Sequence, residues 1–142
     1  MRRPDTERFL ERIVPEPNTG CWLWTGGLGS HGYAQFWFNN QQGLGHRWSY
    51  KYFRGPLLPG YTIDHLCRVR SCVNPHHLEQ VTYQTNILRG IGITAIHARA
   101  TKCPQGHPYT ADNTYIRKGT RKGRHCKQCN VARTRIARQQ YA

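Results

Sequence analysis

The stretch 61–90, YTIDHLCRVRSCVNPHHLEQVTYQTNILRG, decides the fold of this chain. It brings an Asp-His pair, two cysteines, an Asn-Pro dipeptide, two further histidines and a late asparagine into thirty residues. Cys67, Cys72 and His77 follow a C-x4-C-x4-H pattern, and thiolate and imidazole ligands are typical of zinc. A zinc ion with no open coordination position is structural, and in a short chain it replaces hydrophobic core.

A second set of polar side chains in the same stretch suits a different kind of metal. Asp64, His65 and Asn86 supply a carboxylate, an imidazole base and an amide oxygen. These are the parts of a hydrolytic site that uses a hard divalent cation, because such cations prefer oxygen ligands and keep several waters. The stretch therefore predicts two metals side by side, one that holds the fold and one that acts on a phosphate.

The order of these residues resembles that of the HNH nucleases, also called ββα-metal or His-Me finger nucleases. Over residues 21–90 the chain is also similar to the His-Cys box homing endonucleases and to small HNH proteins of phages. The residues that carry this resemblance are His65-x-Cys67-x4-Cys72-x-Asn74-Pro75-x-His77-Leu78, followed by Asn86.

The resemblance implies a metal-dependent DNA endonuclease that hydrolyses phosphodiester bonds. In such an enzyme His65 would be the general base, and Asp64 and Asn86 would hold one Mg2+ or Mn2+ ion against the scissile phosphate. A phosphate oxygen would be held by a cation, with Arg47 as the first candidate and Arg68 or Arg70 as the others.

One departure from the family patterns affects Asp64. In many HNH nucleases the middle position of the motif only supports the loop, whereas His77 is assigned to zinc here, as in the His-Cys box. That box typically lacks a carboxylate beside its base, and this chain has Asp64. The site thus mixes the patterns of the two families, and the His-Cys box pattern supports the roles of His65 and Asn86 but not that of Asp64.

The first zinc set lacks a fourth ligand within the stretch. Cys21 is the only other cysteine before Cys103, and we assign it to this zinc. The alternative is a free Cys21 that packs as a small buried hydrophobe. The resemblance agrees with the assignment, because His-Cys box enzymes also take one ligand from well upstream.

The C-terminal part of the chain carries a second set of zinc-ligand residues. Cys103-x3-His107 and Cys126-x2-Cys129 make two short ligand pairs, as zinc knuckles do. His125, next to Cys126, is a competing ligand. We expect a second structural zinc on the four residues of the two pairs.

The chain is strongly basic, and most of its excess charge lies in this C-terminal part. The 142 residues carry a formal net charge of +14, and from Arg99 onward eleven Lys and Arg residues stand against one acid, Asp112. Such a charge favours a polyanionic partner, DNA or RNA, over a merely solvated basic surface. The nuclease resemblance implies that this partner is double-stranded DNA. The residues expected to contact DNA are Arg68, Arg70, Arg117, Lys118, Arg121, Lys122 and Arg124.

The compartment follows from what the sequence lacks. No apolar run is long enough for a transmembrane helix, and the N-terminus MRRPDTERFLERIV has no apolar core of a secretion signal. We therefore expect no membrane partner and a cytoplasmic location, in the host cell of a phage or mobile element. There, six cysteines are better explained as metal ligands than as disulfides, which an even number also allows. The oligomeric state is open, a homodimer included.

The residue pattern predicts an α+β fold with a zinc-stabilised ββα-metal nuclease core, an N-terminal antiparallel β-sheet and a C-terminal zinc-knuckle module. The predicted elements are a helix from Pro4 with Phe9, Leu10, Ile13 and Val14 on one face, strands at 21–25 and 31–39, a helix at 44–53, strands at 61–66 and 77–81, a helix from its N-cap Thr82 to Leu88, and a basic helix at 130–140. The predicted domains are a nuclease domain, 1–92, a linker, 93–100, and a basic nucleic-acid-binding module, 101–142.

Two other functions compete with the nuclease. A non-catalytic zinc protein that regulates by binding DNA or RNA would explain the basic module, but it has no use for Asp64, His65 and Asn86 together. A structural zinc protein that binds other proteins is disfavoured by the charge. Among the remaining candidates, His46 is expected to be a hydrogen-bonded core or cap histidine, and Arg47 is as compatible with a solvated surface position as with a phosphate contact.

Overall fold

A computed structural model describes residues 3–118 and 123–140, and the chain divides into two compact units, Met1–Gly90 and Ile91–Ala142. Both units mix helices with two-stranded antiparallel sheets, so the predicted α+β class is confirmed. The first unit contains α1 (Asp5–Leu10), β1 (Ile13–Pro15), β2 (Trp22–Trp24), β3 (Gln35–Phe38), β4 (Gln41–Leu44), α2 (Gly45–Phe53), β5 (Tyr61–His65), a 3-10 turn η1 (Pro75–His77), β6 (Leu78–Thr82) and α3 (Tyr83–Arg89). The second contains α4 (Ile93–Arg99), β7 (Thr114–Ile116), β8 (Arg124–Cys126) and α5 (Lys127–Gln140).

The core of the first unit is a cluster of aromatic rings from α1, β2, β3 and α2. Phe9 is fully buried, and its ring centroid lies 5.1 Å from those of Trp24 and Phe36 and 4.3 Å from that of Trp48. The alternation predicted for the second strand is present, because Phe36 is 2% exposed and its neighbour Trp37 is 51% exposed. This core holds α2 against the sheet that precedes it.

The first helix is shorter than the sequence predicts. It ends at Leu10, and Ile13 and Val14 belong instead to β1, where they pair with Trp24 and Leu23 of β2. A helical spacing of apolar residues over so few positions does not exclude a strand, and pairing with β2 decides between the two. The prediction that Ile13 and Val14 continue the helical face is therefore wrong.

A tight hairpin delivers the chain into α2. Strands β3 and β4 pair in antiparallel register across Asn39 and Asn40, which both have positive φ (46° and 57°), as a two-residue type I′ turn requires. Gly45 then opens α2, and a Cβ there would lie 2.9 Å from Cβ of Ala34. The close approach explains the glycine and leaves α2 packed against the strand.

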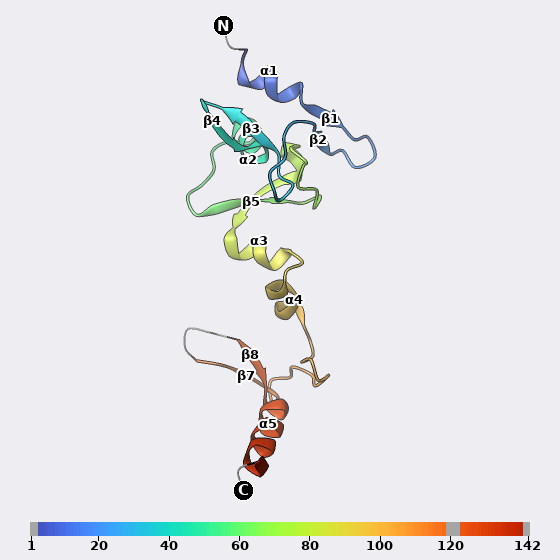
Figure 1. Ribbon diagram of the computed structural model, residues 1–142, viewed down its shortest axis with the longest axis vertical. Coiled ribbons are helices and arrows are strands. Elements are labelled where there is room, and N and C mark those ends of the chain that lie inside the picture. Colours follow the sequence, from blue (N-terminus) through green and yellow to red (C-terminus); the bar gives the residue numbers. More distant parts are fainter. Residues whose placement is uncertain (1–2, 119–122, 141–142) are drawn as a thin grey trace. The chain divides into compact units, whose positions relative to one another are not determined.

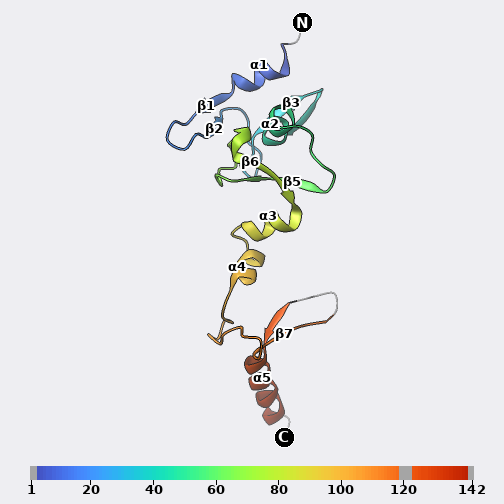
Figure 2. The same ribbon diagram turned by 180° about the vertical axis from the view of Figure 1, so that it is seen from behind.

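The predicted β-β-α order is present in residues 61–89. Strand β5 pairs with β6 along its whole length, from Tyr61↔Thr82 to His65↔Leu78, and α3 follows directly (Figure 1). Thr82 caps α3, as its hydroxyl accepts a hydrogen bond of 3.2 Å from the Thr85 N–H. Figure 2 shows the same hairpin and helix from behind.

The segment expected to be a linker contains the helix α4. Its last carbonyls accept hydrogen bonds from Arg124: Nη2 bonds the oxygens of His97, Ala98 and Ala100, the last at 3.0 Å. The same guanidinium lies 4.7 Å from the ring centroid of Tyr109. A partner more than twenty residues away stabilises α4, so the local sequence could not reveal this helix. Of the helices in 3–118 and 123–140, none has the length and apolar character needed to cross a membrane.

Candidate metal centres and the Asp64-His65 site

The predicted ligands of the first zinc converge. Cys21, Cys67, Cys72 and His77 place one donor atom each within 4.8 Å of all the others. His77 Nδ1 lies 3.5 Å from Sγ of Cys21 and 3.7 Å from Sγ of Cys72. Bonds of about 2.3 Å to sulfur and about 2.0 Å to nitrogen put the corners of a tetrahedron roughly 3.5–3.8 Å apart. The donor set therefore fits zinc.

Backbone pairing brings the distant Cys21 to this cluster. Strand β2 forms a bridge between Leu23 and Cys72, which holds the start of β2 beside the metal loop. Asn74 strengthens the junction, because its amide donates a 2.6 Å hydrogen bond to the Gly20 carbonyl and its oxygen accepts one of 2.9 Å from the His76 N–H. The fourth ligand is thus positioned by main-chain contacts on both sides of it.

Burial disfavours the thiolate forms of the cysteines in this cluster unless a positive charge lies nearby. It raises the pKa of Cys72 to about 12 and also raises the pKa of Cys67, because a thiolate is poorly stabilised away from water. All six cysteines are free. A bound zinc ion would supply the charge that stabilises the thiolates.

The second cluster has the same geometry. Cys103, His107, Cys126 and Cys129 also place their donor atoms within 4.8 Å of one another. Nδ1 of His107 lies 3.2–3.7 Å from the three sulfurs. The competing ligand His125 is outside the cluster and stacks on Tyr115, with ring centroids 5.2 Å apart. These donors also fit a structural zinc.

Asn113 supports this second cluster, although the sequence analysis does not single it out. It is 8% exposed, and its amide donates to Sγ of Cys126 (3.4 Å) and to the Pro108 carbonyl (2.8 Å). Its oxygen accepts a 3.1 Å hydrogen bond from the Gln128 N–H. Burial opposes the Cys126 thiolate, but donors from the Cys129 backbone and from Asn113 outweigh it and lower the Cys126 pKa to about 6. A single asparagine in a polar loop carries no sequence signal for this role.

Asp64 lies buried at the end of β5, between two arginines. Its Oδ1 accepts a 2.7 Å hydrogen bond from Arg68 Nη1. Its Oδ2 is buried without a hydrogen-bond partner, and Arg89 of α3, which pairs with Glu79, stays 3.6 Å away. A buried carboxylate oxygen without a donor is costly, and it is an appropriate ligand for a hard divalent cation. The site therefore fits the second kind of metal.

His65 is held in one orientation by the metal loop. It is 6% exposed, and its Nε2 lies 3.1 Å from the Cys72 carbonyl oxygen. Because a carbonyl only accepts, Nε2 carries the proton and Nδ1 has the free lone pair. Burial lowers the pKa of His65, against the opposing effects of the carbonyl and of Asp64. Burial thus favours the neutral ring, whose Nδ1 can accept a proton.

His46 of α2 is the neighbour of His65 that the sequence analysis leaves among core residues. It is 5% exposed, and its ring centroid lies 4.8 Å from that of His65 and 5.2 Å from that of Tyr33. Burial, followed by His65 and Arg47, lowers its pKa to about 3. The core position is as expected, but Nδ1 is buried without the expected hydrogen bond. The sequence signalled only that His46 lies at the start of a helix, and it did not indicate the contact with His65.

Asn86 and Arg47 are placed differently with respect to Asp64 and His65. Asn86 is half-buried on α3, three residues before Arg89, so the two share a helix face. Since Arg89 reaches towards Asp64, that face is turned to β5. Arg47 is exposed and lines a separate hollow that includes Lys51. Neighbouring helix residues point about 100° apart, and His46 already faces His65.

Several arginines expected to contact DNA have partners within the protein. Arg68 pairs with Asp64, and Arg70 donates a 3.1 Å hydrogen bond to the His31 carbonyl. Arg124 binds the end of α4. The others are Arg117 and Lys118, which are exposed after β7, and Arg121 and Lys122, which lie outside the described residues.

Comparison with known proteins finds one family and two phage relatives, and the family match lies in the first unit. Residues 44–87 match the family described as HNH endonuclease. The chain is 36% identical over 66 residues to Protein 7.7 of Escherichia phage T7. The aligned residues cover 46% of this chain and 51% of that protein. It is 39% identical over 44 residues to the uncharacterized gene 5.3 protein of Enterobacteria phage T3, which covers 31% of this chain and 44% of that protein.

The chain thus spans about half the length of the curated relatives it matches. No solved structure matches it. The resemblance to HNH endonucleases and to small phage proteins that the motif predicts is confirmed, and the family match contains Asp64, His65 and Asn86.

Proposed function

From the similarity of residues 44–87 to HNH endonucleases, we propose that this protein is a metal-dependent endonuclease that hydrolyses phosphodiester bonds in double-stranded DNA. The observation that carries the proposal is the arrangement of two neighbouring residues. His65 has a pKa lowered by burial and is oriented by the Cys72 carbonyl, and beside it Asp64 has a buried oxygen with no hydrogen-bond partner, 3.6 Å from Arg89. A protein that only binds nucleic acid gains nothing from this pair.

His65 acts as the general base. Its Nε2–H is bound to the Cys72 carbonyl, so Nδ1 takes the proton from the attacking water. The loop that carries this carbonyl is closed by the first zinc-ligand cluster. A zinc ion bound by this cluster would hold the loop, and the Cys72 carbonyl of that loop orients the base and selects its tautomer.

Asp64 and Asn86 would hold the catalytic cation through their side-chain oxygens, which are ligands that both Mg2+ and Mn2+ prefer. When bound, such an ion polarises the phosphate and stabilises the leaving oxygen. Arg68 pairs with Asp64 through a side chain that is 52% exposed. It can therefore turn from the carboxylate to a phosphate oxygen, which makes Arg68 a better phosphate ligand than Arg47.

The test is cleavage of supercoiled plasmid with and without Mg2+, comparing the parent with His65→Ala. Loss of a general base typically costs about 10²–10⁴-fold in rate. We expect the cleavage rate of His65→Ala to fall by this factor while the variant keeps its zinc content and its affinity for DNA. The matched control is His97→Ala, which removes an exposed histidine of α4 and should cut at the parental rate.

Equal cleavage by the parent and His65→Ala would contradict the proposal. DNA binding without cleavage in the parent would favour the second candidate, a zinc-dependent regulator that binds DNA or RNA. The same gels separate nicked from linear product. Direct linearisation would support the homodimer, because each chain carries one Asp64-His65 pair.

A further inference from the structure

Helix α5 buries none of its residues within its own unit. It is the longest element of the described chain, with 14 residues. A helix of this length in a folded protein normally depends on packing an apolar face. Within the described residues, its first turn is fixed through Cys129 in the second cluster and through the Gln128 N–H on Asn113.

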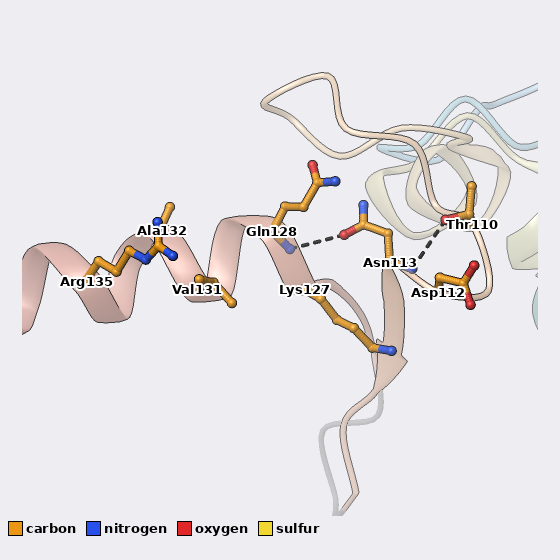
Figure 3. A pocket seen from close by; sticks show the side chains of 8 residues that line it. All are labelled: Thr110, Asp112, Asn113, Lys127, Gln128, Val131, Ala132 and Arg135. Atoms are coloured by element: carbon orange, nitrogen blue, oxygen red, sulfur yellow. Dashed lines mark hydrogen bonds between the residues drawn. The ribbon is translucent and has the colours of Figure 1, made fainter.

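Figure 3 shows this attachment: Asn113 meets the first turn, and the side chains of Val131 and Arg135 extend from the turns beyond it. A hollow beside these turns is lined by Thr110, Asp112, Asn113, Lys127, Gln128, Val131, Ala132 and Arg135. The zinc-ligand cluster thus sets the direction of a helix whose remaining surface meets solvent.

The side of α5 opposite the cluster forms one line of residues. Each residue turns the helix by about 100°, so Arg138, nine residues after Cys129, lies on the opposite side of the axis. Arg133, four residues after Cys129, lies on the cluster side, and its Nε is 3.4 Å from the Cys129 carbonyl oxygen. The residues on this opposite side, called the open line below, are Lys127, Val131, Thr134 and Arg138. The first two also border the hollow.

The charge of α5 is entirely positive. Its charged residues are Lys127, Arg133, Arg135 and Arg138, and it contains no acid. None of the ion pairs formed within 3–118 and 123–140 involves these four cations. They are therefore available to an anionic partner.

We propose that α5 is a recognition helix that enters the major groove of double-stranded DNA, with the line from Lys127 to Arg138 towards the bases. A helix of this length measures about 21 Å, and the groove is about 12 Å wide and admits one helix. Arg138 would bind guanine O6 and N7, and Val131 would contact a thymine methyl group. The inference rests on the proposed DNA substrate, but not on cleavage.

A second copy of the chain fits this surface less well. The large apolar residues on α5 are Val131 and Ile136, which are 51% and 56% exposed and five positions apart. A coiled-coil seam needs apolar residues that repeat every three and four positions, and two copies of α5 would also bring like charges together. The charge and spacing favour DNA.

The experiment uses the full-length, zinc-loaded His65→Ala protein so that the DNA stays intact. A preferred sequence is first selected from random duplexes. Its affinity is then compared for two otherwise identical variants, Arg138→Ala on the open line and Arg133→Ala on the cluster side. Both remove one arginine from the same helix, and zinc content and circular dichroism verify that both fold.

We expect Arg138→Ala to weaken binding of the selected sequence by about 10- to 100-fold and to weaken an unrelated duplex far less. Arg133→Ala should weaken both duplexes by the same small factor, as loss of a phosphate contact does. Methylation of guanine N7, which lies in the major groove, should interfere with the parent at one position and not with Arg138→Ala.

Four results would overturn the inference. Selection could enrich no sequence, or Arg138→Ala and Arg133→Ala could weaken binding of the selected sequence equally. Interference could arise only from minor-groove methylation at adenine N3, or an RNA duplex could bind as tightly as DNA. Each of these leaves the cleavage test of His65→Ala unaffected. Failure of the recognition helix and failure of the endonuclease are therefore distinguishable.

Discussion

At the scale of single residues, His46 is a core residue that packs against the proposed base His65. Its ring meets His65 edge to face, with an interplanar angle of 63°. We expect His46→Ala to let the base rotate and to lower the cleavage rate by about 10–100-fold, the usual cost of losing a residue that orients a reactive group. The measurement is single-turnover cleavage alongside DNA affinity.

A positioning role predicts that the single-turnover rate constant falls while DNA affinity and zinc content stay at the parental values. His46→Phe keeps an aromatic ring in the site and should restore part of the rate. The exposed histidine variant His31→Ala serves as the control. Parental cleavage by His46→Ala would show that His46 only fills space.

At the scale of elements, Arg124 joins a strand to a helix. Its guanidinium binds the carbonyls at the end of α4 and covers the ring of Tyr109, which a lysine cannot reproduce with one ammonium group. Arg124→Lys should therefore destabilise α4 by about 1–2 kcal/mol without changing the net charge. Amide hydrogen exchange should become faster in α4 and remain unchanged in β5 and β6. Unchanged protection of α4 would contradict this role, and Arg117→Lys is the control.

At the scale of the whole molecule, the two zinc-ligand clusters lie in separate units, Cys21, Cys67, Cys72 and His77 in the first and Cys103, His107, Cys126 and Cys129 in the second. Structural zinc contributes about 10–16 kcal/mol of apparent binding free energy, comparable to the whole stability of a small domain. We expect elemental analysis to find two zinc ions in the parent and one in either Cys72→Ala or Cys126→Ala. Each variant should lose structure only in its own unit, as read by hydrogen exchange.

A chelator should remove both ions and unfold both units, and circular dichroism monitors that transition. A folded protein that contains no zinc would refute the assignment of both clusters. Loss of both ions in a single-cysteine variant would instead show that the two units depend on each other.

The sequence by itself determined the features that depend on short spacings. These are the ligand pairs around Cys67 and Cys126, the strand-strand-helix order with its Thr82 cap, and the neighbouring Asp64 and His65. Local spacing sets periodicity and caps, and ligands that come from one metal-binding loop recur at short intervals because that loop must close around the ion. The distant ligand Cys21 could be assigned by elimination, since few cysteines were available.

Only the tertiary structure decided the contacts between residues that are far apart in the chain. Examples are His46 against His65, Arg89 near Asp64, and Arg124 on the end of α4. It also decided that Ile13 pairs in a strand rather than extending a helix. Such contacts depend on how elements pack, and one histidine or arginine carries no mark of the partner that packing will bring to it.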